Sequence, residues 1–71
     1  MQVMERRAFG QRVYRLRRLK GWTQEICVEK VGIGIRTLQM IESYRVEPTI
    51  DTVRKLAHAF GCGWRELLGK P

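Results

Sequence analysis

The sequence predicts an all-α fold, a compact bundle of five short helices. Apolar residues recur at the three- and four-residue spacing of amphipathic helices along most of the chain. Strict alternation of apolar and polar residues, which is typical of strands, does not extend beyond a few positions. Glycines separate the apolar segments at short intervals, so we expect connections of about two to six residues between the helices.

The first helix is predicted from Glu5 to Lys20. Phe9, Val13 and Leu16 share one face of this helix, and Leu19 extends their stripe. Another face carries three arginines at three-residue spacing, Arg12, Arg15 and Arg18. These arginines either follow the phosphates of a polyanion or form a solvated surface.

Two short helices follow, separated by a tight turn that contains glycine. Thr23 is a good N-cap for the second helix, which we expect to end near Val31, where Gly32 breaks it. The third helix is predicted from Ile35 to Ser43, and the apolar residues on its inner side are Leu38 and Ile41.

The last two helices supply the rest of the core. A loop over residues 44–48 leads to Thr49, which we expect to cap the fourth helix. The apolar stripe of the fourth helix contains Ile50, Val53, Leu56, Ala57 and Phe60. A short fifth helix, predicted over residues 64–68, closes the core with Trp64, Leu67 and Leu68.

Length and composition limit the possible functions. With 71 residues, the chain is expected to form a single domain (residues 1–71), too small for an enzyme cleft between domains. No stretch approaches the ~20 apolar residues that cross a bilayer, and residues 1–10 lack the apolar run of a secretory signal. Cys27 and Cys62 fit no metal or redox spacing, so we expect a cytoplasmic protein without disulfides.

Charge is the first indication of a partner. Fourteen basic and seven acidic side chains give a net charge of +7 at pH 7. The excess is concentrated in residues 1–20, where seven basic residues against Glu5 alone leave +6. Such a segment indicates nucleic acid or an anionic membrane surface, and the alternative is that the charge serves solubility alone. Because the bundle needs the apolar stripe of the first helix, we favour nucleic acid.

Residues 23–42 have the two short helices and the glycine turn of a helix-turn-helix unit. The turn at Gly32 is expected to set the two helices at a steep angle, with Ile33 filling the gap between them. The outer face of the third helix then projects from the body, in a shape that fits a DNA major groove about 12 Å wide.

Beyond this unit, the chain resembles the Cro/phage-repressor type of helix-turn-helix regulator, the XRE family. The resemblance covers roughly residues 8–69, and it is specific because many elements agree in order and spacing. The matching elements are Phe9-Gly10, Arg12-Val13, Leu16-Arg17, Lys20 to Glu25, Gly32-Ile33, Leu38, Ile41-Glu42, Pro48, Leu56-Ala57, Phe60-Gly61 and Leu67-Leu68.

The resemblance implies roles for individual residues. The base-reading positions would be Gly34, Ile35, Arg36, Gln39 and Met40. Contacts to the DNA backbone would come from Thr23, Gln24, Ser43 and Arg45. A structural ion pair between the first and third helices would join Arg17 and Glu42. Their chemistry suits these roles, because arginine pairs with guanine, glutamine pairs with adenine, and a helix N-terminus favours phosphate.

Four positions depart from the family pattern. Val28 stands where alanine is favoured, at the contact of the second and third helices, and Ile26 replaces a residue that is usually polar. Gly34 replaces serine or threonine, so the third helix is expected to lack a side-chain cap. Tyr44 stands where glycine is usual, and a positive φ there would cost a tyrosine roughly 1 kcal/mol or more.

We therefore expect a regulator that binds double-stranded DNA, as a repressor and a homodimer on a pseudo-palindromic operator. The dimer surface is expected on the fifth helix, the loop before it or near Trp64. Alternatives are an antitoxin or a restriction–modification controller of the same fold, and a protein-interaction module that does not bind DNA. Paired carboxylates, an activated nucleophile and a phosphate-binding glycine loop are missing, so we expect no enzyme, catalytic residue, cofactor, metal or small-molecule substrate.

Overall fold

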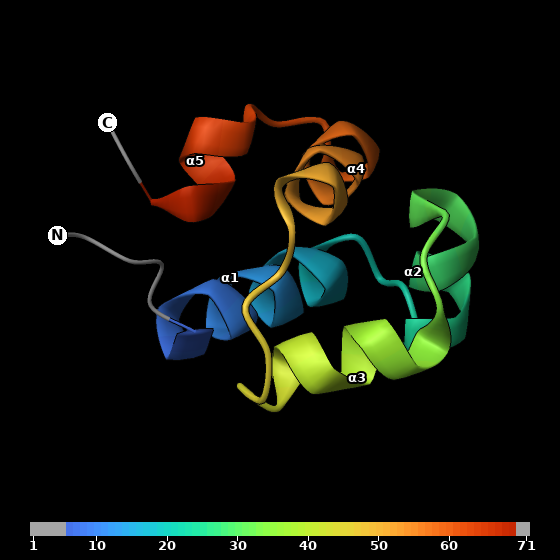
Figure 1. Ribbon diagram of the computed structural model, residues 1–71. Coiled ribbons are helices and arrows are strands. Elements are labelled where there is room, and N and C mark those ends of the chain that lie inside the picture. The colour runs from blue at the N-terminus through green and yellow to red at the C-terminus, as the bar shows by residue number, and fades with distance from the viewer. Residues whose placement is uncertain (1–5, 70–71) are drawn as a thin grey trace, which may run out of the picture.

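The computed structural model describes residues 6–69, and these residues form five helices and no strand (Figure 1). The helices are α1 (Arg6–Leu19), α2 (Gln24–Val31), α3 (Ile35–Glu42), α4 (Ile50–Phe60) and α5 (Trp64–Leu68). The predicted all-α fold and the order of its helices are confirmed. Glu5, where we expected the first helix to begin, lies outside the described residues.

The helix ends follow from the residues that stand there. The hydroxyl oxygens of Thr23 and Thr49 accept hydrogen bonds from the N–H groups of residues 26 and 52, at 3.1 and 3.2 Å, and so cap α2 and α4. Gly32 ends α2 in the left-handed conformation, with φ 86°. Gly34 precedes α3 with an extended backbone and no side-chain cap, as expected.

A single apolar core joins all five helices. Its buried members are Phe9, Val13, Cys27, Val31, Leu38, Ile41, Val53, Leu56, Ala57, Phe60 and Leu67. Trp22 is half-buried against this core and stacks on Phe60, with 5.8 Å between the ring centroids. Burying one large aliphatic or aromatic side chain contributes about 1.5–3 kcal/mol, so these contacts supply most of the stability of so short a chain.

Two residues that we assigned to apolar stripes are instead exposed. Leu19 exposes 76% of its surface and Ile50 exposes 53%. Leu19 is the last residue of α1 and Ile50 is the first residue of α4, so each lies at a helix end. Helical spacing identifies the inward face, but it does not show how far the neighbouring helices extend along it. Ile26, by contrast, is exposed as expected.

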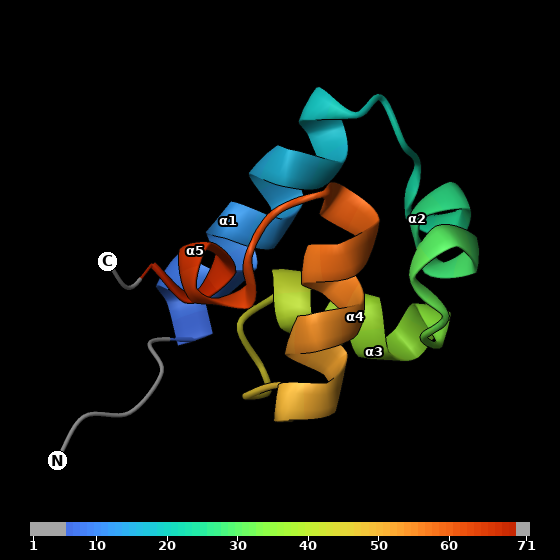
Figure 2. The same cartoon turned by 90° about the horizontal axis from the view of Figure 1, so that it is seen from above.

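The third helix lies at one edge of the molecule. It packs mainly against α1 and α2, and in Figure 1 it lies at the bottom of the molecule, with α4 and α5 at the top. Figure 2 shows the same arrangement from above, with α2 and α5 at opposite ends. Only Leu38 and Ile41 of α3 are fully buried, so the outer face of this helix is open to a partner. No helix within residues 6–69 combines the length and the apolar character needed to cross a membrane.

Candidate nucleic-acid interface

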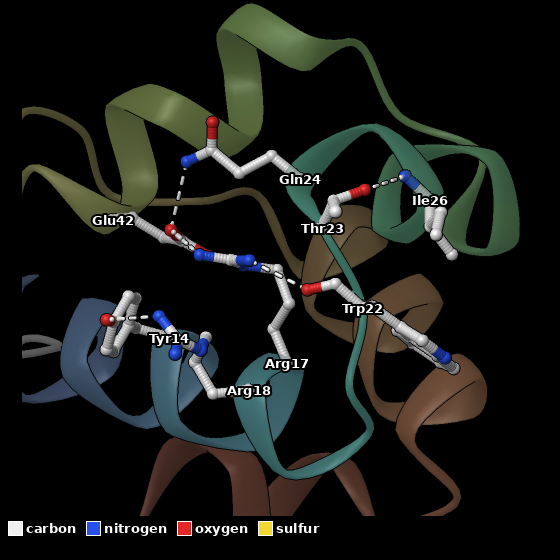
Figure 3. Close-up of polar contacts among 8 residues, drawn as sticks. All are labelled: Tyr14, Arg17, Arg18, Trp22, Thr23, Gln24, Ile26 and Glu42. Carbon is white, nitrogen blue, oxygen red and sulfur yellow. Dashed lines mark hydrogen bonds and ion pairs between the residues drawn. The ribbon is translucent and has the colours of Figure 1, made fainter.

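A cluster of hydrogen bonds, here called the Arg17 node, fixes α3 to the rest of the molecule (Figure 3). The Nε and Nη2 groups of Arg17 donate to the two carboxylate oxygens of Glu42, at 2.7 and 3.0 Å. Nη1 of Arg17 donates to the carbonyl oxygen of Trp22 at 2.8 Å. Nε2 of Gln24 donates to Glu42 at 3.1 Å. The node therefore joins α1, α2 and α3 through one carboxylate.

The ion pair in this node is shielded from solvent. The side chains of Arg17 and Glu42 expose only 9% and 8% of their surfaces. The hydrogen bond to Glu42 raises the pKa of Arg17, an effect that burial partly offsets. Removing one partner of such a pair leaves an uncompensated buried charge, which costs about 3–5 kcal/mol. The ion pair implied by the resemblance is present, and its position indicates a structural role.

The N-terminal end of α2 carries two of the expected contacts to a DNA backbone. Gln24 uses one amide N–H on Glu42, which leaves its second N–H for an acceptor such as a phosphate oxygen. The carbonyl oxygen of Gln24 points away from Glu42 (Figure 3). The Thr23 hydroxyl accepts the capping bond, so its own hydrogen remains a donor. Unpaired N–H groups and the helix dipole add to the attraction for an anion.

Most of the expected DNA contacts line two shallow hollows on either side of α3. The α2–α3 hollow is lined by Arg17, Thr23, Gln24, Glu25, Ile35 and Gln39. The α3–loop hollow is lined by Arg36, Gln39, Met40, Ser43 and Arg45. The structure thus brings together every predicted contact residue except Gly34, which stands exposed at the start of α3.

Besides Thr23 and Gln24, three side chains with hydrogen-bond donors on this surface are available to a ligand. Arg36, Gln39 and Arg45 are exposed, and their side chains have no hydrogen bond or ion pair within residues 6–69. Beside them lie two apolar contributions, the exposed Ile35 and the half-buried Met40. Unpaired donors beside apolar groups are what recognition of base edges requires.

The hydroxyl of Ser43 does not point toward a ligand. Its Oγ donates to the carbonyl oxygen of Met40 at 3.3 Å, and its backbone N–H donates to the carbonyl oxygen of Gln39 at 3.0 Å. A phosphate oxygen needs a donor, and both donors of Ser43 are engaged in this conformation. The reason is local, because a serine that follows a helix readily bonds back to the last turn.

Apart from Arg17, the basic side chains of α1 do not line the two hollows beside α3. Nη1 of Arg12 donates to the carbonyl oxygen of Leu67 at 3.0 Å, so this arginine holds the end of α5. Arg15 and Arg18 remain on the outer face of α1, where a third hollow is lined by Gln11, Tyr14, Arg15, Arg18, Leu19 and Tyr44.

Glu25 is a feature of the interface that the sequence interpretation missed. We assigned no contact to this residue, yet it lines the α2–α3 hollow beside Gln24. Its carboxylate repels phosphate, so it opposes the attraction of the helix N-terminus. Glu25 directly follows Gln24 in the sequence, and this position could have indicated that its carboxylate lies at the same interface. No group of three His, Cys, Asp or Glu side chains among the described residues is placed to hold a metal ion.

An exposed helix, held by a buried ion pair next to an anion-attracting helix N-terminus, defines a helix-turn-helix DNA-binding module. Comparison with known proteins leads to the same class. Residues 13–67 match the family model HTH_3, described as helix-turn-helix. The chain belongs to this XRE-type helix-turn-helix family of transcriptional regulators, and membership implies binding to double-stranded DNA.

One relative and one solved structure agree with this assignment. An uncharacterised HTH-type transcriptional regulator of Sinorhizobium fredii, y4dJ, is 38% identical over 63 residues, which span 89% of this chain and 82% of the relative. The crystal structure of a hypothetical transcription factor from Neisseria, NHTF, is 25% identical with a TM-score of 0.86. The match covers 94% of this chain and 77% of that one.

Proposed function

We propose that this regulator is a repressor that binds a pseudo-palindromic operator as a homodimer. The observation that carries the proposal is the exposed outer face of α3, with its unpaired Arg36 and Gln39 between two hollows. Two such helices would enter successive major grooves about 34 Å apart. The bound dimer would occlude a promoter, acting on DNA in the cytoplasm, and residues 1–71 would work as a single domain.

The residues on α3 would read the bases. Arg36 would donate two hydrogen bonds to guanine and Gln39 would pair with adenine, each adding about 1–3 kcal/mol of discrimination. Ile35 and Met40 would contact thymine methyl groups. Gly34 supports a close approach, because the nearest atom to a side chain added there would be the Thr37 Oγ1 atom, at 4.0 Å.

Contacts to the DNA backbone would fix the register of this helix. Thr23 and Gln24 would donate to one phosphate at the start of α2, and Arg45 would reach another from beyond α3. Ser43 would join them only after its hydroxyl turns away from Met40. Because charged contacts release counterions, the affinity would fall steeply as salt is raised.

The dimer surface is better sought on α4 than on α5. Leu67 is buried, and the half-buried Trp64 ring lies under Arg54 and Arg65, at 6.0 and 5.3 Å from its centroid. None of the large apolar side chains that are exposed within residues 6–69 belongs to α5. Ile50, at the start of α4, is one of them and offers apolar surface for a second copy.

Selection of bound sequences from a random duplex pool tests the proposal. We expect two inverted half-sites about one helical turn apart. Arg36→Ala should relax the preference at one position in each half-site, whereas Arg15→Ala, a matched change on the outer face of α1, should leave the preference intact. A uniform loss of affinity with intact preference would make Arg36 a backbone contact. A lack of salt-sensitive binding to duplex DNA would overturn the function itself.

A further inference from the structure

The residue that follows α3 has an unusual backbone conformation. Tyr44 has φ 66°, the only positive φ of a non-glycine residue within residues 6–69. Its N–H donates to the carbonyl oxygen of Ile41 at 3.2 Å, and the N–H of Arg45 donates to that of Met40 at 2.9 Å. These two bonds form a Schellman motif, in which the left-handed position usually holds glycine.

Contact with α1 explains why a tyrosine is held there. Gly10, buried in α1, leaves space for the tyrosine ring. A β-carbon added at Gly10 would lie 2.8 Å from the Tyr44 Cδ1 atom and would also collide with the carbonyl oxygen of Ile41. The guanidinium of Arg7 also lies 5.9 Å from the centre of the ring. These surroundings over-determine a backbone conformation that tyrosine itself disfavours.

The conformation of Tyr44 sets the course of the backbone toward Arg45. Arg45 lines the α3–loop hollow, and its guanidinium has no partner among the described residues. The backbone N–H groups of residues 43–45 are all engaged with carbonyl oxygens of α3. The Arg45 side chain is therefore a charged donor that this turn leaves free for a ligand, and the position of its Cα atom depends on where Tyr44 directs the chain.

We propose that Tyr44 is a positioning residue, whose ring, seated against Gly10, fixes residues 43–45 and so directs Arg45 to the DNA backbone. This inference rests on the proposed function, because it assigns Arg45 to a phosphate. Glycine at position 44 adopts the same φ without cost but has no ring to seat. Replacement by glycine therefore removes the anchor while it keeps a turn that the backbone favours.

The test compares Tyr44→Gly and Tyr44→Phe for affinity to the selected operator, each alone and combined with Arg45→Ala. We expect Tyr44→Gly to weaken binding about tenfold, the loss of one charged hydrogen bond. Tyr44→Phe, which keeps the ring, should bind within about twofold of the parent. In the Arg45→Ala background, Tyr44→Gly should add less than about a twofold loss, because both changes remove the same contact.

A second measurement separates the anchor from DNA binding. In the protein without DNA, Tyr44→Gly should speed hydrogen exchange at the Arg45 amide, and Tyr44→Phe should not. Parent-like affinity of Tyr44→Gly, or losses that multiply in the double variant, would overturn the positioning role alone. Failure of the parent chain to bind any duplex would instead overturn the proposed function, and this inference with it.

Discussion

The two ends of α3 are built in opposite ways. The N-terminal end, here called the open end, begins at Gly34, where no side chain caps the helix and space is open around the residue. The C-terminal end, here called the closed end, is fixed by the buried Arg17 node and by the ring of Tyr44 against α1. The difference teaches how a small domain presents a binding helix: the contacts that stabilise α3 are concentrated at its closed end, and its open end is left without a side-chain cap.

Breaking the closed end at Glu42 should have the largest effect. Glu42→Ala leaves the Arg17 guanidinium buried without its carboxylate, which costs about 3–5 kcal/mol. Chains of this size have about 5–10 kcal/mol of stability in total, so the variant should be largely destabilised. Urea unfolding followed by circular dichroism measures the loss.

A double substitution by apolar residues is the matched control. Arg17→Met combined with Glu42→Leu removes both charges, and should recover much of the stability lost in Glu42→Ala. Equal instability of the double and single variants would show that packing at these positions, and not the stranded charge, determines the loss.

The seat of the tyrosine ring should give the second-largest effect. Gly10→Ala forces a β-carbon into the Tyr44 ring and the Ile41 carbonyl oxygen, and over-packing of this kind costs about 1–3 kcal/mol. The thermal midpoint measures it. Adding Tyr44→Gly should restore part of the loss, because only the contact with the carbonyl then remains. Additive losses would contradict the proposed seat.

Alkaline pH should destabilise the folded protein through Cys27, which is fully buried in α2. Burial raises the pKa of the Cys27 thiol, and the nearby Glu42 carboxylate raises it further, against a smaller lowering by Arg17. Above about pH 8.5 an unfolded chain releases this proton while the folded one retains it, so stability falls as pH rises. The expected slope is at most about 1.4 kcal/mol per pH unit.

Comparing variants isolates this contribution from other groups that titrate in the same range. The free energy of unfolding at pH 7.5 and 9.5 should decrease more in the parent chain than in Cys27→Ala. Burial also raises the pKa of the Cys62 thiol, so Cys62→Ala should reduce the pH dependence as well and measures the share of the second thiol. Parallel pH dependence of the parent and Cys27→Ala would exclude Cys27 as the source.

Capping the open end should have the smallest effect. Gly34→Ser supplies an oxygen for the unpaired N–H groups of α3, in a backbone conformation that already suits an N-cap. The gain should be a few tenths of a kcal/mol, or about 1–2 °C in the thermal midpoint. Gly34→Ala, which lacks the hydroxyl, should give no such gain. An equal gain in both would point to backbone entropy and not to the cap.

The sequence predicted local features of the fold better than contacts between distant segments. Thr23 and Thr49 mark helix starts because a capping hydroxyl acts within three residues. Leu19 and Ile50 were misassigned because helical spacing does not show where the covering helices end.

For the interface, the resemblance predicted the ion pair of Arg17 and Glu42, which lie 25 residues apart. A positive φ at Tyr44 could be anticipated from its place after α3. The seat against Gly10 could not, because it depends on how closely α1 and α3 approach. The engagement of Ser43 with Met40 depends on a rotamer, which residue type alone does not determine.

The carboxylate of Glu42 is shared between Arg17 and Gln24. One acidic group thus has two roles: it stabilises the fold through Arg17, and it orients the Gln24 amide that is expected to face DNA. As operators diverge, α3 can accept substitutions at other positions. A substitution at Glu42 would impair both the folding of the domain and the orientation of Gln24. New binding preferences should therefore arise by exchange of residues along the outward face of the helix, with this glutamate left unchanged.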